Sequence, residues 1–290
     1  MANSPKHSGK ESREKLGFWR ANRFLILRRV TQFSILTMFL SGPYLNFWIL
    51  KGNYSGSLLF DTIPLTDPLI VAESLATGYL PNSSTIIGTI IVVSIYALLG
   101  SKVFCGWVCP LNVVTDCAAW LRRKLGIRQS AKLPRGLRYG ILLMILMGSA
   151  VSGVLLWEWI NPVSALGRAL IYGVGATTLL ILAVFLFDLF IVEHGWCGHL
   201  CPIGAIYGVI GAKSLLRIKV VEQQKCDHCM DCYHICPEPQ VLRAPLHGKN
   251  NESRFVLSKD CISCGRCIDV CAEKVFIFSN RFNYSGSDQK

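Results

Sequence analysis

Cysteine is the residue whose number and spacing point most directly to chemistry, since the chain has 13 cysteines among 290 residues. Eight of them form two copies of the pattern Cys-x2-Cys-x2-Cys-x3-Cys. Three thiolates at this spacing wrap one corner of a [4Fe-4S] cube, while the fourth, in two-cluster proteins, reaches the other cluster. The pattern predicts two [4Fe-4S] clusters, with a zinc site as the competing interpretation. The predicted ligands are Cys226, Cys229, Cys232 and Cys271 for the first cluster and Cys261, Cys264, Cys267 and Cys236 for the second.

Four more cysteines occur in two Cys-x3-Cys-Pro motifs, Cys105 with Cys109 and Cys197 with Cys201. The prolines that follow suit the first turn of a helix, where the helix dipole favours a thiolate. These thiolates could hold a metal or a further iron-sulfur centre, or form two redox dithiols; four buried structural cysteines are the remaining possibility. Structural positions are expected for the other candidates: Cys117 in the core, His194 and His199 in packing or capping, and His228 and His234 at the surface or beside a cluster.

The Cys-x3-Cys-Pro motif is part of an internal repeat. Residues 66–69 read Thr-Asp-Pro-Leu and residues 160–163 read Ile-Asn-Pro-Val, and each is followed by an apolar stretch and one cysteine pair. Two spans in each unit would give both copies the same orientation in a membrane. A pseudo-two-fold axis along the membrane normal would then bring the two cysteine pairs together at the cytoplasmic face.

The composition points to a membrane protein, because 51% of the residues are hydrophobic and only 17% are charged. Stretches long enough to span a bilayer as helices lack Asp, Glu, Lys and Arg at residues 30–50, 74–101, 139–157 and 169–187. The predicted fold is a polytopic α-helical membrane protein with four transmembrane helices and an internal two-fold repeat, followed by a C-terminal α+β bacterial-type 2[4Fe-4S] ferredoxin domain.

Predicted strands in this last domain lie at 217–221, 254–257 and 275–278. The expected organisation is a basic cytoplasmic N-terminus at 1–29, a membrane domain at 30–212 with repeats 30–138 and 139–212, and a cytoplasmic ferredoxin-like domain at 213–290.

Basic residues alternate along the chain as the positive-inside rule requires for this topology. All of the 30 Lys and Arg residues except Lys51 and Arg168 fall in the N-terminus, the middle loop or the tail. Both termini are therefore expected in the cytoplasm. Arg20, Arg23, Arg28 and Arg29 are interpreted as a juxtamembrane anchor that touches anionic lipid. Since topology accounts for the net charge of +12, no nucleic-acid partner is predicted.

The combination of four spans, two Cys-Gly-x-x-Cys-Pro motifs and paired ferredoxin motifs resembles the NapH type of ferredoxin-like membrane subunit from periplasmic nitrate reductase systems, close to the MauN proteins of methylamine systems. The resemblance implies an electron-transfer subunit of a quinol dehydrogenase in the bacterial inner membrane. It would pass electrons from quinol towards a periplasmic nitrate reductase through an iron-sulfur partner of the NapG type. A cytoplasmic ferredoxin-type partner of the NapF kind is a further expectation, and the functionally important pairs fall on Cys105, Cys109, Cys197 and Cys201.

Quinol oxidation releases protons, so ionisable residues near the outer side are candidates to bind quinol or accept protons: Asp67, Glu73 and Glu158. Helix capping and interfacial polar roles are the alternative for each.

Two other function classes remain open. One is a metal-handling, copper-reducing assembly factor for a respiratory oxidase, although the sequence has no His- or Met-rich tract. The other is a redox-sensing membrane regulator.

The charge pattern makes the topology testable. Reporter fusions placed at residues 60 and 160 should report the outside, and fusions at residue 125 and at the C-terminus should report the cytoplasm. Paired alkaline phosphatase and fluorescent protein reporters would measure both sides, and the reverse pattern would reject the proposed orientation.

Overall fold

The computed structural model describes residues 8–100, 102–127, 129–131, 133–173, 175–247 and 254–282. The chain forms two compact units. Unit 1 combines Met1–Arg29, Tyr96–Trp107 and Tyr207–Lys290, and unit 2 combines Val30–Ile95 with Val108–Ile206. The ferredoxin-like tail thus shares its unit with the N-terminal segment and with a short stretch from the middle of the chain.

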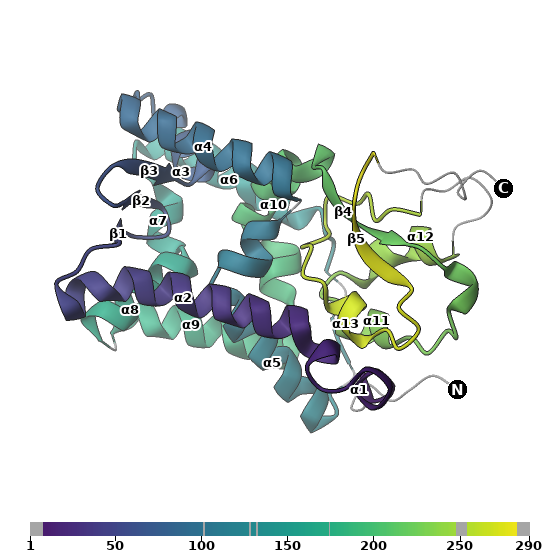
Figure 1. The fold of residues 1–290 in the computed structure, drawn as a ribbon. Helices are drawn as coiled ribbons and strands as arrows, with labels where there is room; N and C mark the ends of the chain where they lie inside the picture. Colours follow the sequence, from purple (N-terminus) through teal and green to yellow (C-terminus); the bar gives the residue numbers. More distant parts are fainter. Residues whose placement is uncertain are drawn as a thin grey trace. The chain divides into compact units, whose positions relative to one another are not determined.

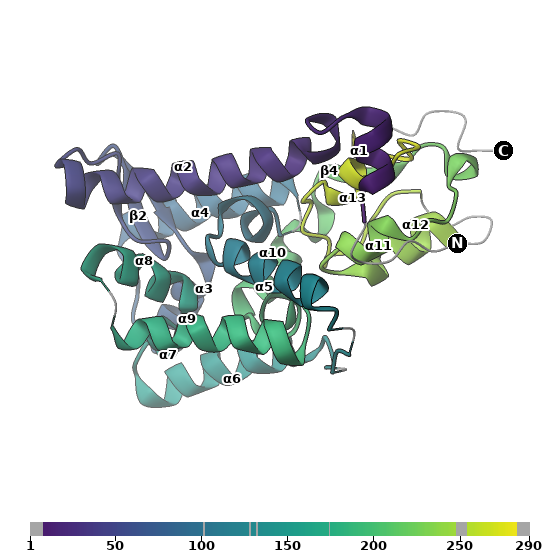
Figure 2. The same ribbon diagram turned by 90° about the horizontal axis from the view of Figure 1, so that it is seen from below.

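Unit 2 is mainly helical. Its long apolar helices run along a common direction (Figures 1 and 2). They are α2 (Arg23–Leu45, from Val30 onward), α4 (Ser83–Leu99, up to Ile95), α6 (Leu137–Ser152) and α9 (Ala176–Leu186). Shorter helices connect or cover them: α3 (Pro68–Ala76), α5 (Leu111–Leu125), α7 (Leu156–Ile160), α8 (Pro162–Tyr172) and the start of α10 (Pro202–Ile210). A small antiparallel sheet has the order β1 (Leu50–Gly52), β2 (Gly56–Leu59), β3 (Ile63–Thr66).

The internal repeat is present in the local structure. The two cysteine motifs each contain a single π-helical turn, Phe104–Val108 and Trp196–Leu200. Helices α3 and α8 also begin alike, because Asp67 and Asn161 each cap the helix by accepting a hydrogen bond from the backbone N–H two residues later. A proline follows each cap at the first helical position, where its missing N–H costs nothing. The sequence repeat is therefore a repeat of folded elements.

The expected spans are shorter and more divided than the hydropathy predicted. Gly153 ends α6 with φ of 69°, and Gly173 separates α8 from α9 with φ of 88°. Glycine adopts this left-handed conformation at little cost and stops a helix, although the residues around it stay apolar. Gly42 and Pro43 do not break the first span, since α2 continues to Leu45.

Among the described residues, one helix, Arg20–Leu45 with its leading 3-10 turn, is long and apolar enough to cross a membrane. The apolar helices Ser83–Leu99, Leu137–Ser152 and Thr177–Ile191 are shorter.

Unit 1 contains a small α+β domain, as predicted for the tail. Strand β4 (Leu216–Val220) pairs antiparallel with β5 (Phe276–Asn280). The expected third strand is reduced to a single bridge, Lys219 with Phe255. Short helices α11 (Asp231–Ile235), α12 (Arg243–His247) and α13 (Arg266–Val270) complete the domain around a core that includes Val220, Val256 and Phe276.

The N-terminal segment is an integral part of unit 1. Helix α1 (Lys10–Leu16) lies against α13, where Ser12 Oγ donates to the Asp269 backbone carbonyl at 2.6 Å. The Asp269 carboxylate in turn accepts from the backbone N–H groups of Phe24 and Leu25. The lipid-anchor interpretation is wrong for Arg28, because its side chain is 1% exposed and its Nε donates to the Gly106 carbonyl at 2.8 Å.

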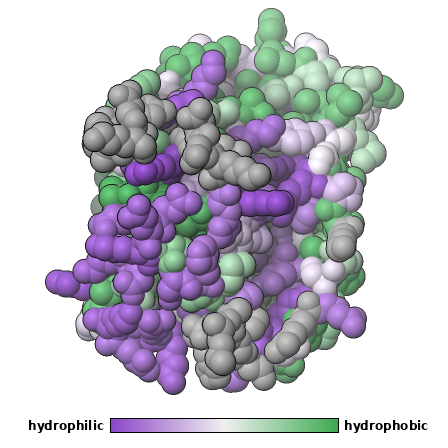
Figure 3. Space-filling model, turned by 90° about the vertical axis from the view of Figure 1, so that its right-hand side faces the viewer, coloured by the Kyte–Doolittle hydropathy of each residue, from purple (hydrophilic) through white to green (hydrophobic). Residues whose placement is uncertain are grey.

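The two units have different surfaces. The surface of unit 1 seen in Figure 3 is mainly hydrophilic. Large apolar side chains are instead exposed along the long helices of unit 2: Phe33 on α2, Ile87 and Ile90 on α4, Leu143, Met144 and Met147 on α6, and Leu179 and Leu182 on α9. Exposed apolar surface on several parallel helices is unusual for a water-soluble protein.

Candidate functional site

The first group of cysteines surrounds a cavity in unit 1. Cys226, Cys229 and Cys232 line it from the loop before α11 and from α11 itself, and Cys271 lines it from the second motif. The distant fourth cysteine thus shares the cavity with the three neighbouring ones. Burial raises the pKa of the Cys232 thiol to about 12, so the free thiol would be protonated and metal binding would release its proton.

The second group lies in the same unit, and three of its members are almost fully buried. Cys261, Cys264 and Cys267 are 9%, 6% and 5% exposed. The negative charges of the neighbouring cysteines, Cys236 among them, add to burial in raising the pKa of the Cys267 thiol. Four mutually repelling thiolates in this setting need a cationic core to stay charged.

The loop of the second group is held by the first Cys-x3-Cys-Pro motif, within unit 1. The Trp107 indole Nε1 donates to the Ser263 carbonyl at 3.0 Å. A Cβ on Gly106 would lie 2.8 Å from the Ile262 carbonyl oxygen and 3.9 Å from the Cys264 Cβ, so only glycine allows the two backbones to approach this closely. The motif that carries Cys105 is therefore in direct contact with the second cysteine loop.

The other members of the Cys-x3-Cys-Pro pairs, Cys109, Cys197 and Cys201, lie in unit 2, whereas Cys105 lies in unit 1. The pKa of Cys109 is raised to about 12, mainly by burial and next by the charge of Cys201, although two backbone N–H groups at the start of α5 oppose this increase. The predicted helix start is present, but burial outweighs the dipole and the free thiol stays protonated. Thr115 Oγ1 is 3.8 Å from the Cys197 sulfur.

Each cysteine motif is also held by a buried arginine: Arg28 was interpreted from the sequence as a lipid anchor, and Arg138 was not singled out. Arg28 donates to the carbonyl of Gly106, and Arg138, 1% exposed, donates to the carbonyl of the equivalent Gly198 at 3.2 Å. Arg28 lies near the start of α2 and Arg138 near the start of α6, the long helices with which the two repeats begin. What the two arginines share is the contact with the glycine of a cysteine motif, and this contact is seen only in the folded structure.

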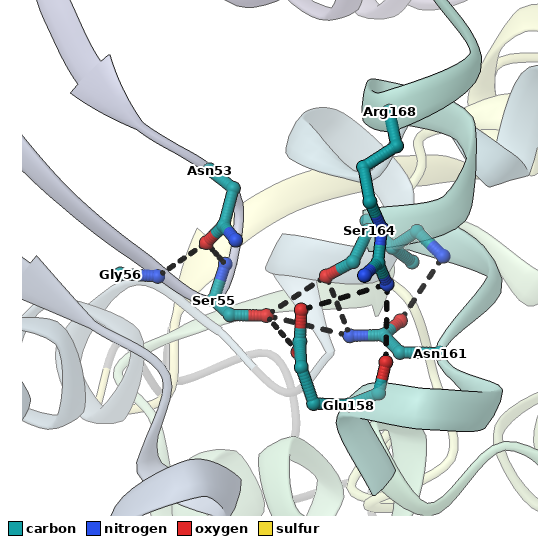
Figure 4. Close-up of polar contacts among 8 residues, drawn as sticks. Asn53, Ser55, Gly56, Glu158, Asn161, Ser164 and Arg168 are labelled. Atoms are coloured by element: carbon teal, nitrogen blue, oxygen red, sulfur yellow. Dashed lines mark hydrogen bonds and ion pairs between the residues drawn. The ribbon is translucent and has the colours of Figure 1, made fainter. Parts of the chain in front are cut away.

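A cluster of polar side chains lies in unit 2 where the two repeats meet (Figure 4). Ser55 Oγ donates to Glu158 Oε2 at 2.9 Å and lies 3.0 Å from Ser164 Oγ. Asn161 Nδ2 donates to Ser164 Oγ at 3.1 Å, and Arg168 lies 3.8 Å from the Glu158 carboxylate. Ser55 comes from the first repeat and the other four from the second, so the cluster joins the two halves.

Glu73 makes a second connection between the repeats. Its carboxylate is fully buried, and Oε1 accepts from Ser149 Oγ at 2.8 Å and from the Trp157 backbone N–H at 2.9 Å. Within the described part of the chain, Oε2 has no hydrogen-bond partner, and neither has the buried Trp157 indole nitrogen. Each buried polar atom that lacks a partner in an apolar interior is costly.

Asp67 is the carboxyl whose chemistry the fold changes most clearly. Its pKa is raised to about 7, mainly by burial; the Leu69 backbone N–H opposes this increase, and the nearby charges of Glu158 and Glu73 add to it. The Asp67 charge also contributes to the raised pKa of Cys109. The three predicted carboxyls thus influence one another, and Asp67 lies within electrostatic range of a cysteine of the first pair.

The remaining expectations have mixed outcomes. Cys117 is exposed and not in the core, because the buried face of α5 carries Leu111, Thr115, Ala118 and Arg122 while residue 117 lies off that face. His194 is buried with Nδ1 4.0 Å from Asp116, as expected for a packing role. His228 lines the first cysteine cavity and stacks on His247.

Among the described residues, no three His, Cys, Asp or Glu side chains gather closely enough for a single metal ion.

These features define a class. Two cysteine groups in a small α+β domain, joined to a repeated cysteine motif on apolar helices, make this a ferredoxin-type iron-sulfur electron-transport protein. The family described as a 4Fe-4S binding domain matches residues 82–128 and again 174–220, which also supports the repeat. The family described as a 4Fe-4S dicluster domain matches residues 225–275, a range that contains all eight tail cysteines.

The comparison with curated proteins identifies the family. The chain is 75% identical to "Ferredoxin-type protein NapH" of Haemophilus influenzae, over 99% of this chain and 100% of the relative. It is 56% identical to the Escherichia coli protein of the same name, over 98% of each chain. Identity is 43% to "Methylamine utilization ferredoxin-type protein MauN" of Methylorubrum extorquens, over 91% of this chain and 92% of the relative. The chain therefore belongs to the NapH/MauN family of ferredoxin-type proteins. No solved structure matches it.

The raised pKa of Asp67 predicts a pH dependence of stability. The folded state holds the proton up to about pH 7, whereas an unfolded Asp loses it near pH 4, so the free energy of unfolding should fall as pH rises between these values, by about 1–4 kcal/mol. Asp67→Asn keeps the capping oxygen and removes the charge, so its thermal unfolding in detergent should lose this part of the pH dependence.

The equivalent cap in the second repeat supplies the matched control. Asn161→Asp places a carboxyl at a position that is 2% exposed, and it should introduce a similar decrease in stability above pH 5. Equal pH profiles for the wild type and Asp67→Asn would show that Asp67 titrates as an ordinary surface carboxyl.

Proposed function

We propose that this protein is the membrane electron-transfer subunit of a quinol dehydrogenase. It takes electrons from membrane quinol and passes them towards a periplasmic nitrate reductase through an iron-sulfur partner of the NapG type. The observation that carries the proposal is the pairing of two cysteine groups in unit 1 with an apolar, repeated helical body in unit 2. A lipid-soluble electron donor needs the second feature and one-electron transfer needs the first.

The helical body is proposed to cross the bacterial inner membrane four times, with α2, α4, α6 and α9 as spans and both termini in the cytoplasm. The exposed apolar side chains on all four helices support this, since lipid would cover them. Helices of 17 residues or fewer are shorter than the hydrocarbon core, so the short helices α3, α7 and α8 would complete the passage or lie at its outer edge.

The eight tail cysteines are proposed to hold two [4Fe-4S] clusters. Cys226, Cys229, Cys232 and Cys271 line one cavity and therefore fit a cube-shaped group. The charges of Cys236, Cys261, Cys264 and Cys267 act on one another, which fits a second group. When bound, the clusters accept and release single electrons. Burial favours the protonated form of the free thiols, so iron binding would release their protons. The close approach of Gly106 holds the second cysteine loop in place.

The two Cys-x3-Cys-Pro pairs are proposed to form a further redox or metal centre. Cys109 and Cys201 come from different repeats and interact electrostatically, which supports a shared role. The buried arginines Arg28 and Arg138 favour negative charge at both motifs.

Proton release from quinol requires an acceptor, and Asp67, Glu73 and Glu158 are proposed for this task. A carboxyl with pKa about 7 binds and releases a proton near neutral pH, which suits Asp67 to a general-base role. Glu158 is 3.8 Å from Arg168 and partly exposed, so it could pass protons to solvent. A cytoplasmic ferredoxin-type protein of the NapF kind is a second proposed partner.

Anaerobic reduction of the detergent-held protein by a quinol analogue, followed by low-temperature EPR and an iron count, tests the function. Signals of reduced [4Fe-4S] clusters should appear with quinol, and iron clearly above about eight atoms per chain would indicate the further centre. Reduction by dithionite but not by quinol, with the NapG-type partner present, would contradict quinol oxidation and favour the metal-handling alternative.

The ligand assignment has its own test. Cys232→Ser should remove the EPR signal of one cluster and about half of the iron while most of the other signal remains. Cys117→Ser is the matched control, because Cys117 is exposed and outside both groups. Retention of both signals in Cys232→Ser would reject the assignment.

A further inference from the structure

Unit 1 buries several cationic side chains, and they differ in how their charge is balanced. Lys102 is 2% exposed and lies 3.3 Å from the carboxylate of Asp260. Arg266 is 8% exposed and lies 2.9 Å from the carboxylate of Asp269. Arg217, on strand β4, is 1% exposed. In the described part of the chain, no carboxylate pairs with it in this way.

Within the described residues, the Arg217 guanidinium is bound by backbone carbonyls. Its Nη1 donates to Ser258 at 3.1 Å, and its Nη2 donates to Gly211 and Ala212, each at 2.7 Å. Its Nε is buried and has no hydrogen-bond partner among the residues that the structure describes. Carbonyl dipoles orient a guanidinium and reduce its desolvation cost, but they leave a full positive charge in the interior.

This charge is fixed beside the second cysteine group. The carbonyl of Ser258 that accepts from Arg217 also accepts from the backbone N–H of Cys261, at 3.3 Å. Residues 254–258 are held along β4, where Val256 N donates to the Ile218 carbonyl at 2.8 Å. The guanidinium is thus anchored at the turn where the second cysteine loop begins. The pKa of the Cys261 thiol is raised to about 11, mainly by burial, and the charge of Arg217 opposes this increase.

We propose that Arg217 compensates the negative charge of the cluster held by Cys236, Cys261, Cys264 and Cys267 and thereby raises the reduction potential of that cluster. The inference rests on the proposed ligand assignment. Four thiolates carry more negative charge than the cube carries positive charge, and reduction adds one electron without breaking or forming a bond. Burial of an anion disfavours this step. A buried cation nearby favours it.

The first cysteine group has the opposite electrostatic neighbour. Asp227 lines its cavity, and its charge adds to the raised pKa of Cys229 and Cys271. A negative charge opposes the addition of an electron. Asp227 is exposed to solvent, which screens it, so its effect is smaller than that of the buried Arg217.

The test compares two substitutions of one residue in the full-length protein. In a Cys232→Ser background only the second cluster remains, and its midpoint potential can be measured by EPR during titration with dithionite and mediators. Arg217→Gln removes the charge and keeps a donor for the carbonyls. It should lower the ratio of reduced to oxidised cluster at a fixed potential by about tenfold. Arg217→Lys keeps the charge and should stay near the wild-type potential.

Comparing the Lys and Gln variants tests the role of the charge even if one of them binds its cluster poorly, because cluster retention is a second readout. Equal behaviour of the Lys and Gln variants, in potential or in cluster retention, would overturn the proposal because the charge would then have no role. Asp227→Asn in the same background is the control and should leave this potential unchanged. Failure of the ligand assignment would appear separately, in the Cys232→Ser protein itself. Dithionite supplies the electrons, so a failure of quinol oxidation cannot affect the result.

Discussion

Buried arginines that donate to backbone carbonyls are the interaction on which the rest of this structure depends. A π-helical turn or a cysteine loop leaves carbonyl oxygens without helical partners, and in an interior that water does not reach these must be satisfied. Arg28 and Arg138 serve the two cysteine motifs, Arg217 serves the start of the second cysteine loop, and Arg122 serves the turn at Leu189. All four are 1% exposed. Irregular backbone that can carry redox groups is thus stabilised by charges that also favour negative groups beside it.

The duplicated halves are alike in backbone and different in chemistry. Both halves use a capping side chain followed by proline, but one cap is Asp67 and the other is Asn161. Both contain the same cysteine turn, but Trp107, which donates to the second cysteine loop, is replaced by His199 in the other half. The backbone of the repeat therefore supplies a symmetric frame. Single side chains make the halves differ: only the first half has an ionisable cap, and its tryptophan donates to the second cysteine loop.

The sequence was most informative where the chemistry is local. Ligand spacing, proline after cysteine and the repeated Asx-Pro dipeptide each act within a few residues, so they could be read directly. The role of Arg28 could not be predicted in this way, because the carbonyl to which it donates is 78 residues away in the sequence. An arginine beside an apolar stretch is also readily interpreted as a lipid anchor. Helix lengths were overestimated since apolar composition continues through Gly153 and Gly173, whose conformations end the helices. The exposed position of Cys117 could have been predicted, because the helical period of α5 places residue 117 off the face that carries the buried residues.

The discontinuous composition of unit 1 has a consequence for biosynthesis. The backbone N–H of Gly9 donates to Asp231, and Ser12 donates to Asp269, so the first helix of the chain completes a surface made by the last elements. A ribosome adding about 5–20 residues per second needs roughly ten to fifty seconds to make the intervening chain. The N-terminal segment must wait through that time while the apolar helices emerge. Iron-sulfur assembly in the tail is therefore a late event in the maturation of the protein, after the helical body has been made.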